Sequence, residues 1–185
     1  MQRAELKMTA ETDRLILIAV GPDEVGLVGK ISEFISQHGC NIEDSKMAVL
    51  VGEFALILLL SGESRKLVTI SEVHAELSKQ TGLHITVKKP SARKISHPSL
   101  PYKIVASCMD HPGIVYKVST VLSKFGVNIE SMETDTYAAP ISGTPIFRME
   151  AMLSVPAAVN VNALREQFTE IEKEEGIDLD LTLIS

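Results

Sequence analysis

The sequence predicts an α+β protein built from two similar halves, and two observations carry this prediction. The first is an internal repeat: Asp23–Glu43 aligns without a gap with Asp110–Glu130, and ten of the 21 positions are identical. The second is that both copies show the same order of β-rich runs and helix-spaced apolar residues. A length of 185 residues alone would suggest one domain, but a repeated unit changes the expected number to two.

The two copies differ in length at one place. The offset between them is 87 at Asp23 and Asp110 but 93 at Phe54 and Phe147, so the second copy has gained six residues (93 − 87 = 6). The stretch 138–145 contains two prolines and a glycine and is the expected position of the insertion. A Pro- and Ser-rich stretch separates the copies, so we expect domains at 12–89 and 101–185 joined by a linker at 90–100.

Hydrophobic periodicity defines the elements of the first copy. Residues 15–20 are apolar and β-rich, which predicts a strand, while Leu27, Ile31 and Ile35 follow helical spacing. Gly39 ends that helix in the usual manner of a C-terminal glycine. The remaining expected elements are strands at 41–51, 54–60 and 83–88, and a second helix marked by apolar residues over 67–77 and stopped near Gly82.

The second copy repeats this order. Strands are expected at 103–108, 128–137, 146–155 and 177–183, and helices at 114–125 and 161–174. The order βαββαβ, found twice, is typical of the ferredoxin-like fold. We therefore expect two four-stranded antiparallel sheets, each with its helices on one face.

The two sheets should differ on the face that the helices leave open. Apolar and polar residues alternate over 147–155, as in a strand with one solvated face, whereas 15–20 and 55–60 are apolar throughout. Continuous apolar strands are usually buried on both faces. We expect the second domain or another chain to cover the open face of the first sheet, and we expect a homo-oligomer.

Composition excludes several classes of protein. The net charge of −6 and the presence of only eight aromatic residues (3 Tyr and 5 Phe, no Trp) argue against direct binding of nucleic acid. The longest apolar runs have six residues, far below the roughly 20 of a membrane helix. Two cysteines without a CxxC pair fit a reducing compartment, and the polar first 14 residues do not resemble a signal peptide. We expect a soluble cytoplasmic protein.

No pattern indicates catalysis, a cofactor or a metal. Gly26–Lys30 superficially resembles a phosphate-binding loop, but the required glycine is Glu24 and the required hydroxyl is Ile31. The five histidines and two cysteines show no familiar metal-ligand spacing. No set of nucleophile and base can be assembled, so we expect a protein that is not an enzyme.

The turn after the first strand is the candidate binding feature of each copy. Gly21–Gly26 corresponds to Cys108–Gly113, and a helix follows both. The start of a helix offers unpaired backbone N–H groups and a partial positive charge, and glycine lets a ligand carboxylate approach them. Asp23 and Asp110 stand where a carboxylate would accept a ligand ammonium group. A simple helix cap is the alternative role for Asp at this position.

An asparagine completes the candidate site. Asn41 and Asn128 open the second strand of each copy, which we expect to lie beside the first strand. An amide side chain both donates and accepts hydrogen bonds, so the three features together would suit a small zwitterion such as an amino acid. Ordinary turn chemistry after a glycine is the alternative role for these asparagines.

The repeated blocks Asp-x-x-Gly-Ile/Leu-Val and Asn-Ile-Glu resemble the ACT domain, a βαββαβ module that commonly binds amino acids and regulates. The resemblance covers both copies. In ligand-binding members, the loop after the first strand and the Asn of the second strand meet the ligand near a boundary between domains. The positions that the resemblance implies are Asp23, Gly26, Leu27, Asn41 and Ile42, and then Asp110, Gly113, Ile114, Asn128 and Ile129.

A narrower resemblance concerns the residues after the first helix. Gly39–Leu50, with Leu58–Gly62 and with Gly143–Glu150 of the second copy, is similar to two-ACT-domain repressors of glycine cleavage operons. That resemblance implies a regulator without DNA-binding helices, which binds a LysR-type activator and responds to a small amino acid, glycine or serine. The alternative is an ACT-domain regulatory subunit that controls a metabolic enzyme.

Overall fold

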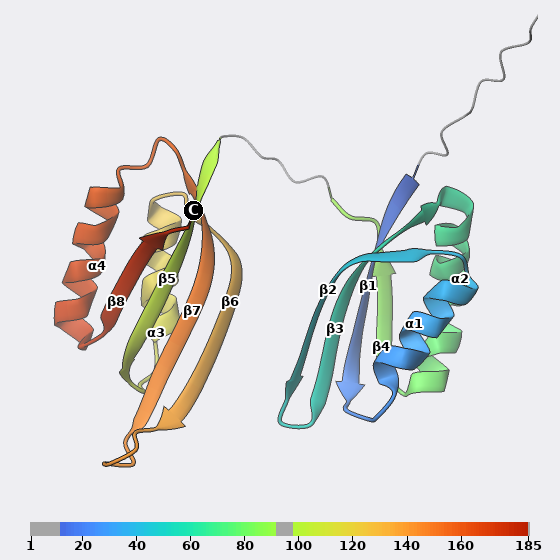
Figure 1. Cartoon of the computed structure of the whole chain (residues 1–185), viewed down its shortest axis with the longest axis horizontal. Coiled ribbons are helices and arrows are strands. Elements are labelled where there is room, and N and C mark those ends of the chain that lie inside the picture. The colour runs from blue at the N-terminus through green and yellow to red at the C-terminus, as the bar shows by residue number, and fades with distance from the viewer. Residues whose placement is uncertain (1–11, 92–97, 185) are drawn as a thin grey trace, which may run out of the picture. The chain divides into compact units, whose positions relative to one another are not determined.

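The computed structural model describes residues 12–91 and 98–184. The chain divides between residues 93 and 94 into two compact units, called the first and the second unit below. Each unit is a four-stranded antiparallel sheet with two helices on one face (Figure 1). The predicted α+β class, with the order βαββαβ in each unit, is confirmed. Residues 92–97 of the expected linker lie outside the described residues.

The first unit has the strand order β2-β3-β1-β4. Strand β3 lies at the centre and pairs with β1 on one side and β2 on the other, so β2 does not lie beside β1. The expectation that the second strand lies beside the first is therefore wrong. The elements are β1 (Thr12–Pro22), α1 (Leu27–Gln37), β2 (Asn41–Leu50), β3 (Glu53–Glu63), α2 (Ser64–Thr81) and β4 (His84–Lys88).

The second unit repeats this arrangement with the order β6-β7-β5-β8. Its β6–β7 connection is longer than the β2–β3 turn and is closed by the N–H of Ala139 donating to the carbonyl of Thr144 at 2.8 Å. The six inserted residues thus extend one hairpin and leave the sheet unchanged. The elements are β5 (Ser99–Met109), α3 (Ile114–Lys124), β6 (Asn128–Ala138), β7 (Pro145–Pro156), α4 (Val161–Glu175) and β8 (Asp178–Leu183).

The first strand of each unit is longer than its apolar run. Strand β5 begins at Ser99, within the stretch expected as linker, because Ser99 already lies opposite Pro156 in the β5–β7 ladder. Strand β1 likewise continues to Pro22, opposite Glu53. Pairing of main-chain groups needs no apolar side chain, so hydrophobic patterning underestimates the ends of such strands.

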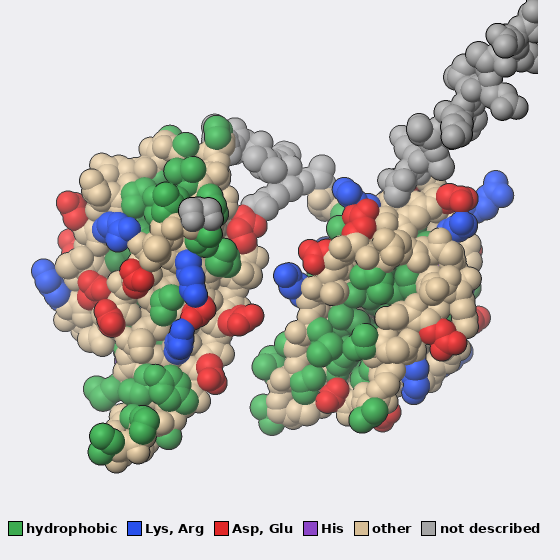
Figure 2. Space-filling model, in the orientation of Figure 1, with side chains coloured by type: hydrophobic (Ala, Val, Ile, Leu, Met, Phe, Trp, Pro, Cys, Tyr) green, Lys and Arg blue, Asp and Glu red, His purple; other side chains and the backbone are tan. Residues whose placement is uncertain are grey.

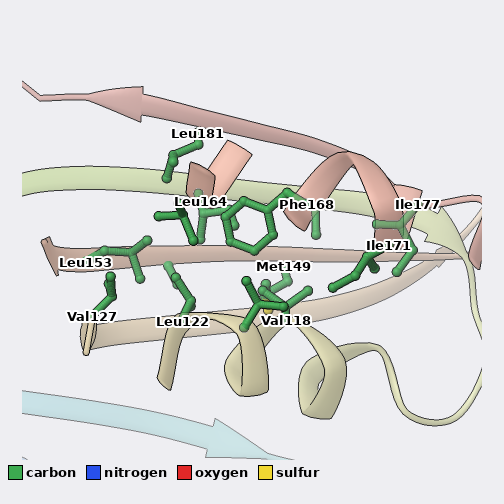
Figure 3. Close-up of a cluster of buried hydrophobic side chains, with 14 of the residues drawn as sticks. Val118, Leu122, Val127, Met149, Leu153, Leu164, Phe168, Ile171, Ile177 and Leu181 are labelled. Atoms are coloured by element: carbon green, nitrogen blue, oxygen red, sulfur yellow. The ribbon is translucent and has the colours of Figure 1, made fainter. Parts of the chain in front are cut away.

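Each unit has its own hydrophobic core between the sheet and its helices. In the second unit, Figure 3 shows side chains of α3 and α4 converging on β7, where Met149 and Leu153 are buried. In the first unit, Leu56 and Leu58 of β3 are buried toward the helices, whereas Ile57 between them is 42% exposed. Burial along β3 therefore alternates, and the first unit by itself buries only one face of this strand.

The β2–β3 turn contains a strained residue. Leu50 pairs with Glu53, which leaves Val51 and Gly52 as a two-residue loop with φ angles of +50° and +87°. Two positive φ angles are typical of a type I′ turn, which favours Asn-Gly. A β-branched residue in this region is a steric outlier, and the Val51 side chain is fully exposed and gains no packing.

The substitution Val51→Asn should therefore stabilise the protein. It creates Asn-Gly at the turn, removes strain of about 1 kcal/mol or more and sacrifices no buried contact. We expect a higher midpoint of urea unfolding, with an unchanged dependence of the free energy on urea. Leu50→Asn, at a neighbouring exposed position within β2, is the control that should not stabilise. An unchanged or lower midpoint for Val51→Asn would show that the turn is not type I′ in solution.

Candidate functional site

The loop between β1 and α1 is held by backbone hydrogen bonds. The N–H of Asp23 donates to the carbonyl of Gly52 at 2.9 Å, which ties the loop to the β2–β3 turn. Gly26 is the N-cap of α1, with φ +93°, and its carbonyl accepts from the N–H of Lys30 at 3.0 Å. Leu27 is buried and anchors the first helical turn in the core. The loop is thus fixed at both of its ends.

The second unit builds the corresponding loop in the same way. The N–H of Asp110 donates to the carbonyl of Pro145 at 3.0 Å, and Gly113 is the N-cap of α3, with φ +101°. Ile114 is buried as Leu27 is. A Cβ added to Gly26 or Gly113 would meet nothing within 4 Å, so the glycines are required by their φ angles rather than by crowding.

The two aspartates do not cap these helices. Neither α1 nor α3 has a side-chain hydrogen bond at its N-cap, so the capping alternative is wrong for both. Asp23 and Asp110 are exposed beside the first helical turn. The backbone N–H groups of that turn have no partner within the helix and carry a partial positive charge. A carboxylate acceptor and anion-attracting amides therefore lie next to each other in both loops.

The asparagines lie at the opposite end of each sheet. Asn41 is opposite Ser61 at one end of β3, whereas the β1–α1 loop follows Pro22, which is opposite Glu53 at the other end. The separation is eight residues along β3 (61 − 53 = 8), or roughly 27 Å at about 3.4 Å per residue. Figure 1 shows β2 starting at the end of the sheet away from the β1–α1 loop. A small amino acid cannot contact both groups within one unit.

Asn128 occupies the corresponding position in the second unit, opposite Ser154. It borders an open hollow of about 430 Å³ where α3 ends and β6 begins. The hollow contains Asn128 and Ile129 but not the loop residues Asp110, Gly113 and Ile114. Its lining is Ser119, Leu122, Ser123, Gly126, Val127, Asn128 and Ile129. The predicted residues therefore form two separate groups, one at each end of the unit.

A β-bulge lies beside each asparagine and was not predicted. The register between β2 and β3 shifts between Ile42 and Asp44, and that between β6 and β7 shifts at the corresponding position. The bulged residues are Glu43, which pairs with Arg14 at 2.8 Å, and Glu130, which accepts from the side-chain N–H of Asn128 at 2.9 Å. Repetition of the whole Asn-Ile-Glu block was the available signal, since bulges recur at sites that redirect side chains.

The two loops differ in their charges. In the first unit Glu24 follows Asp23, so the loop has two adjacent carboxylates. In the second unit His111 follows Asp110, and its Nε2 lies 4.0 Å from Glu175, which also forms an ion pair with Lys117. A ligand carboxylate would meet less repulsion at the second loop.

Exposed apolar side chains surround the loop end of each unit. Val25 of the first loop and Val51 of the adjoining turn are fully exposed. Ile141 at the tip of the β6–β7 hairpin is also fully exposed, and Figure 2 shows hydrophobic side chains at both hairpin tips. Exposed apolar side chains grouped in this way are typical of surfaces that bind another protein.

The described residues offer no group of three metal-ligating side chains, and none of their helices is long and apolar enough to cross a membrane.

The fold and the duplicated loops define a class of protein. Residues 13–88 match the family model of the ACT domain. The first unit is an ACT domain, and the second repeats its strand order, helices and glycine-capped loop. The chain is a tandem protein of two ACT-type units, as the repeated motifs predict.

Individual proteins resemble the chain over nearly its whole length. It is 26% identical over 171 residues to the glycine cleavage system transcriptional repressor of Escherichia coli, covering 89% of each chain. A protein of unknown function from Galdieria sulphuraria is 30% identical, with a TM-score of 0.81 over 95% of this chain and 100% of that one. A structure assigned provisionally as a glycine cleavage system transcriptional repressor has a TM-score of 0.69 over 95% and 99% of the two chains, at 23% identity, and shows the shared fold.

The pKa of the Cys108 thiol depends on the charge of the loop between β5 and α3. It is buried at the end of β5, where burial foremost, and then the negative charge of Asp110, raise the pKa of its thiol. In a Cys40→Ala background, Asp110→Asn should lower this pKa, because it removes one of the two causes. Ultraviolet absorbance of the thiolate during a pH titration measures the shift.

Asp23→Asn, the corresponding change in the first unit, is the control and should leave the titration of Cys108 unchanged. If Asp110→Asn also leaves it unchanged, the carboxylate does not lie near the end of β5.

Proposed function

We propose that the chain is a non-enzymatic regulator that binds a small amino acid, glycine or serine, and represses transcription in the cytoplasm through a DNA-bound activator of LysR type. The observation that carries the proposal is the similarity to the E. coli repressor over 89% of both chains. The duplicated, glycine-capped loop supports the amino-acid part of it. The net charge of −6 supports action through another protein rather than by contact with DNA.

The loop is the half of the candidate site that suits a zwitterion. First-turn N–H groups of a helix attract a carboxylate, and an exposed aspartate beside them accepts an ammonium group. The amide of Asn41 or Asn128 is too far away in the same unit to join them. A ligand that used both features would have to take its loop and its Asn from two different ACT-type units.

Calorimetric titration with the twenty amino acids tests the sensor proposal. We expect heat with glycine or serine, and we expect Gly113→Ala to weaken binding at least tenfold, because φ +101° is a conformation that alanine rarely adopts. Asn41→Ala and Asn128→Ala, measured separately, would show which unit contributes its amide.

Gly143→Ala is the matched control for backbone strain. Gly143 also has a positive φ, +71°, and lies in the β6–β7 connection rather than at a helix start. The substitution Gly143→Ala should lower the free energy of unfolding without changing the affinity for the amino acid. Absence of heat with all twenty amino acids would overturn the sensor proposal.

The partner proposal is tested with a purified LysR-type activator and a DNA fragment from a glycine cleavage operon. In a gel-mobility assay, the chain alone should not shift the DNA. When it is added to the activator–DNA complex, it should reduce the mobility of that complex further. Added glycine should reverse that second shift. A shift by the chain alone would contradict indirect action. An unaltered activator complex, together with recovery of a metabolic enzyme by affinity purification, would favour the enzyme-regulating alternative.

A further inference from the structure

The face of the first sheet opposite its helices, called the outer face below, is apolar along its centre. Directly paired residues of antiparallel strands point to the same side, so the register places Ile16 with Leu59, Ile18 with Ile57 and Val20 with Ala55 on this face. These six side chains form a stripe over β1 and β3. Val20 is 43% exposed and Ile57 42%, and the other four are half-buried.

Charged residues flank this apolar stripe on both edge strands. Asp44 and Lys46 of β2 lie on one side, and Lys88 of β4 lies on the other. Asp44, Leu59, Ile16 and Lys88 stand in one row across the sheet, because each is directly opposite its neighbour in the register. An apolar centre with a charged rim is the usual composition of a protein–protein interface.

The outer face of the second sheet has a different composition. By the repeat, Lys103 stands where the first unit has Ile16, and Glu150 stands where it has Ile57. Lys103 and Glu150 form an ion pair at 2.8 Å, and Arg148 pairs with the same carboxylate. These hydrogen bonds, from Lys103 first and Arg148 second, lower the pKa of Glu150 and so favour its ionised form. Further carboxylates on this face are Glu133, Asp135, Asp178 and Asp180.

The outer faces can pair in three ways, and their charges make these pairings differ in how favourable they are. Two second-unit faces would bring like charges together, with five carboxylates against two cations on each. A first-unit face against a second-unit face would bury those charges against aliphatic side chains, which is strongly unfavourable for each ion left unpaired. Two first-unit faces bring aliphatic stripes together and leave their charged residues on the edge strands, at the rim.

We infer that the outer face of the first sheet binds the same face of a second copy of this chain, forming a two-fold symmetric β-sandwich. Its strands would cross at the small angle usual for aligned sheets. This interface is independent of the amino-acid binding proposed above, and either can fail without the other.

Area and charge both favour a second copy as the occupant. Four strands about 4.8 Å apart, with 10, 11, 11 and 5 residues of about 3.4 Å each, give a face of roughly 600 Å², and two such faces give roughly 1,200 Å², at the lower end of the range of stable complexes. A two-fold axis parallel to the strands lays β2 of one copy over β4 of the other. Asp44 then lies at the level of Lys88 of the second copy, so the rims attract each other.

The second unit supplies the test substitutions. Ile16→Lys with Ile57→Glu gives the first outer face the Lys–Glu pair that the folded second sheet already carries at 2.8 Å. The wild-type chain of 20.2 kDa should sediment at equilibrium as a dimer of about 40 kDa (2 × 20.2). The double variant should weaken dimerisation about a hundredfold or more, because each copy then buries two charges. Circular dichroism and urea unfolding check that it stays folded, and Ile57→Glu alone is used if it does not.

Met152→Glu is the matched control. Met152 occupies on β7 the position that Leu59 occupies on β3. The substitution Met152→Glu should leave the affinity of the dimer unchanged. A wild-type monomer would overturn the inference and would leave the second unit to cover the face. A dimer that persists in the double variant would place the interface elsewhere and would equally overturn it.

A charge exchange tests the orientation of the two copies. Asp44→Lys alone should weaken the dimer roughly five- to tenfold, since two equivalent rim pairs become repulsive. Asp44→Lys combined with Lys88→Asp should restore it. Failure of the second change to restore the affinity would exclude the axis parallel to the strands.

Discussion

Antiparallel pairing of a central strand with both of its neighbours is the constraint on which the rest of each unit depends. Because β3 pairs with β1 and with β2, the latter two strands run in the same direction and start at the same end of the sheet. The loop that leaves β1 and the asparagine that opens β2 are therefore held a full strand length apart. Helix α1, about 16 Å long, spans this distance together with the loops on either side of it, and its buried residues Leu27 and Ile35 fix it to the sheet.

Duplication has kept this scaffold and changed what it presents. Both units retain a glycine at the helix start, a buried aliphatic residue after it and a bulge in the second strand. The outer faces have diverged, with Ile57 in one unit and ion-paired Glu150 in the other. Core positions have also changed, but they stay apolar, because a buried polar side chain would lose its hydrogen bonds to water. Phe34 corresponds to Val121 and Leu58 to Ala151, and all four are buried. On the outer face, which the core does not constrain, apolar residues of the first unit correspond to charged residues of the second.

The sequence predicts the elements well because periodicity reports burial on the helix side of each sheet. It cannot predict that β3 lies between β1 and β2, since strand order depends on which backbone edges meet and not on side-chain pattern. The error about the asparagines follows directly from this. The repeated Asn-Ile-Glu block marked the position correctly, but the omission of Glu43 from the β2–β3 ladder is a property of register. Unbroken apolar runs correctly distinguished the first sheet from the second, although Leu58 is buried and Ile57 is exposed.

The geometry of one unit separates its two surfaces. The outer face lies on the side of the sheet opposite the helices, whereas the glycine-capped loop and the strained Val51 turn lie at its end. A copy packed on the apolar stripe would contact β1 and β3 along their length and would leave the amides of the first helical turn open. Dimerisation and ligand binding would then use different surfaces of the same domain. The fully exposed Val25 and Val51 belong to the loop end of the unit rather than to the apolar stripe.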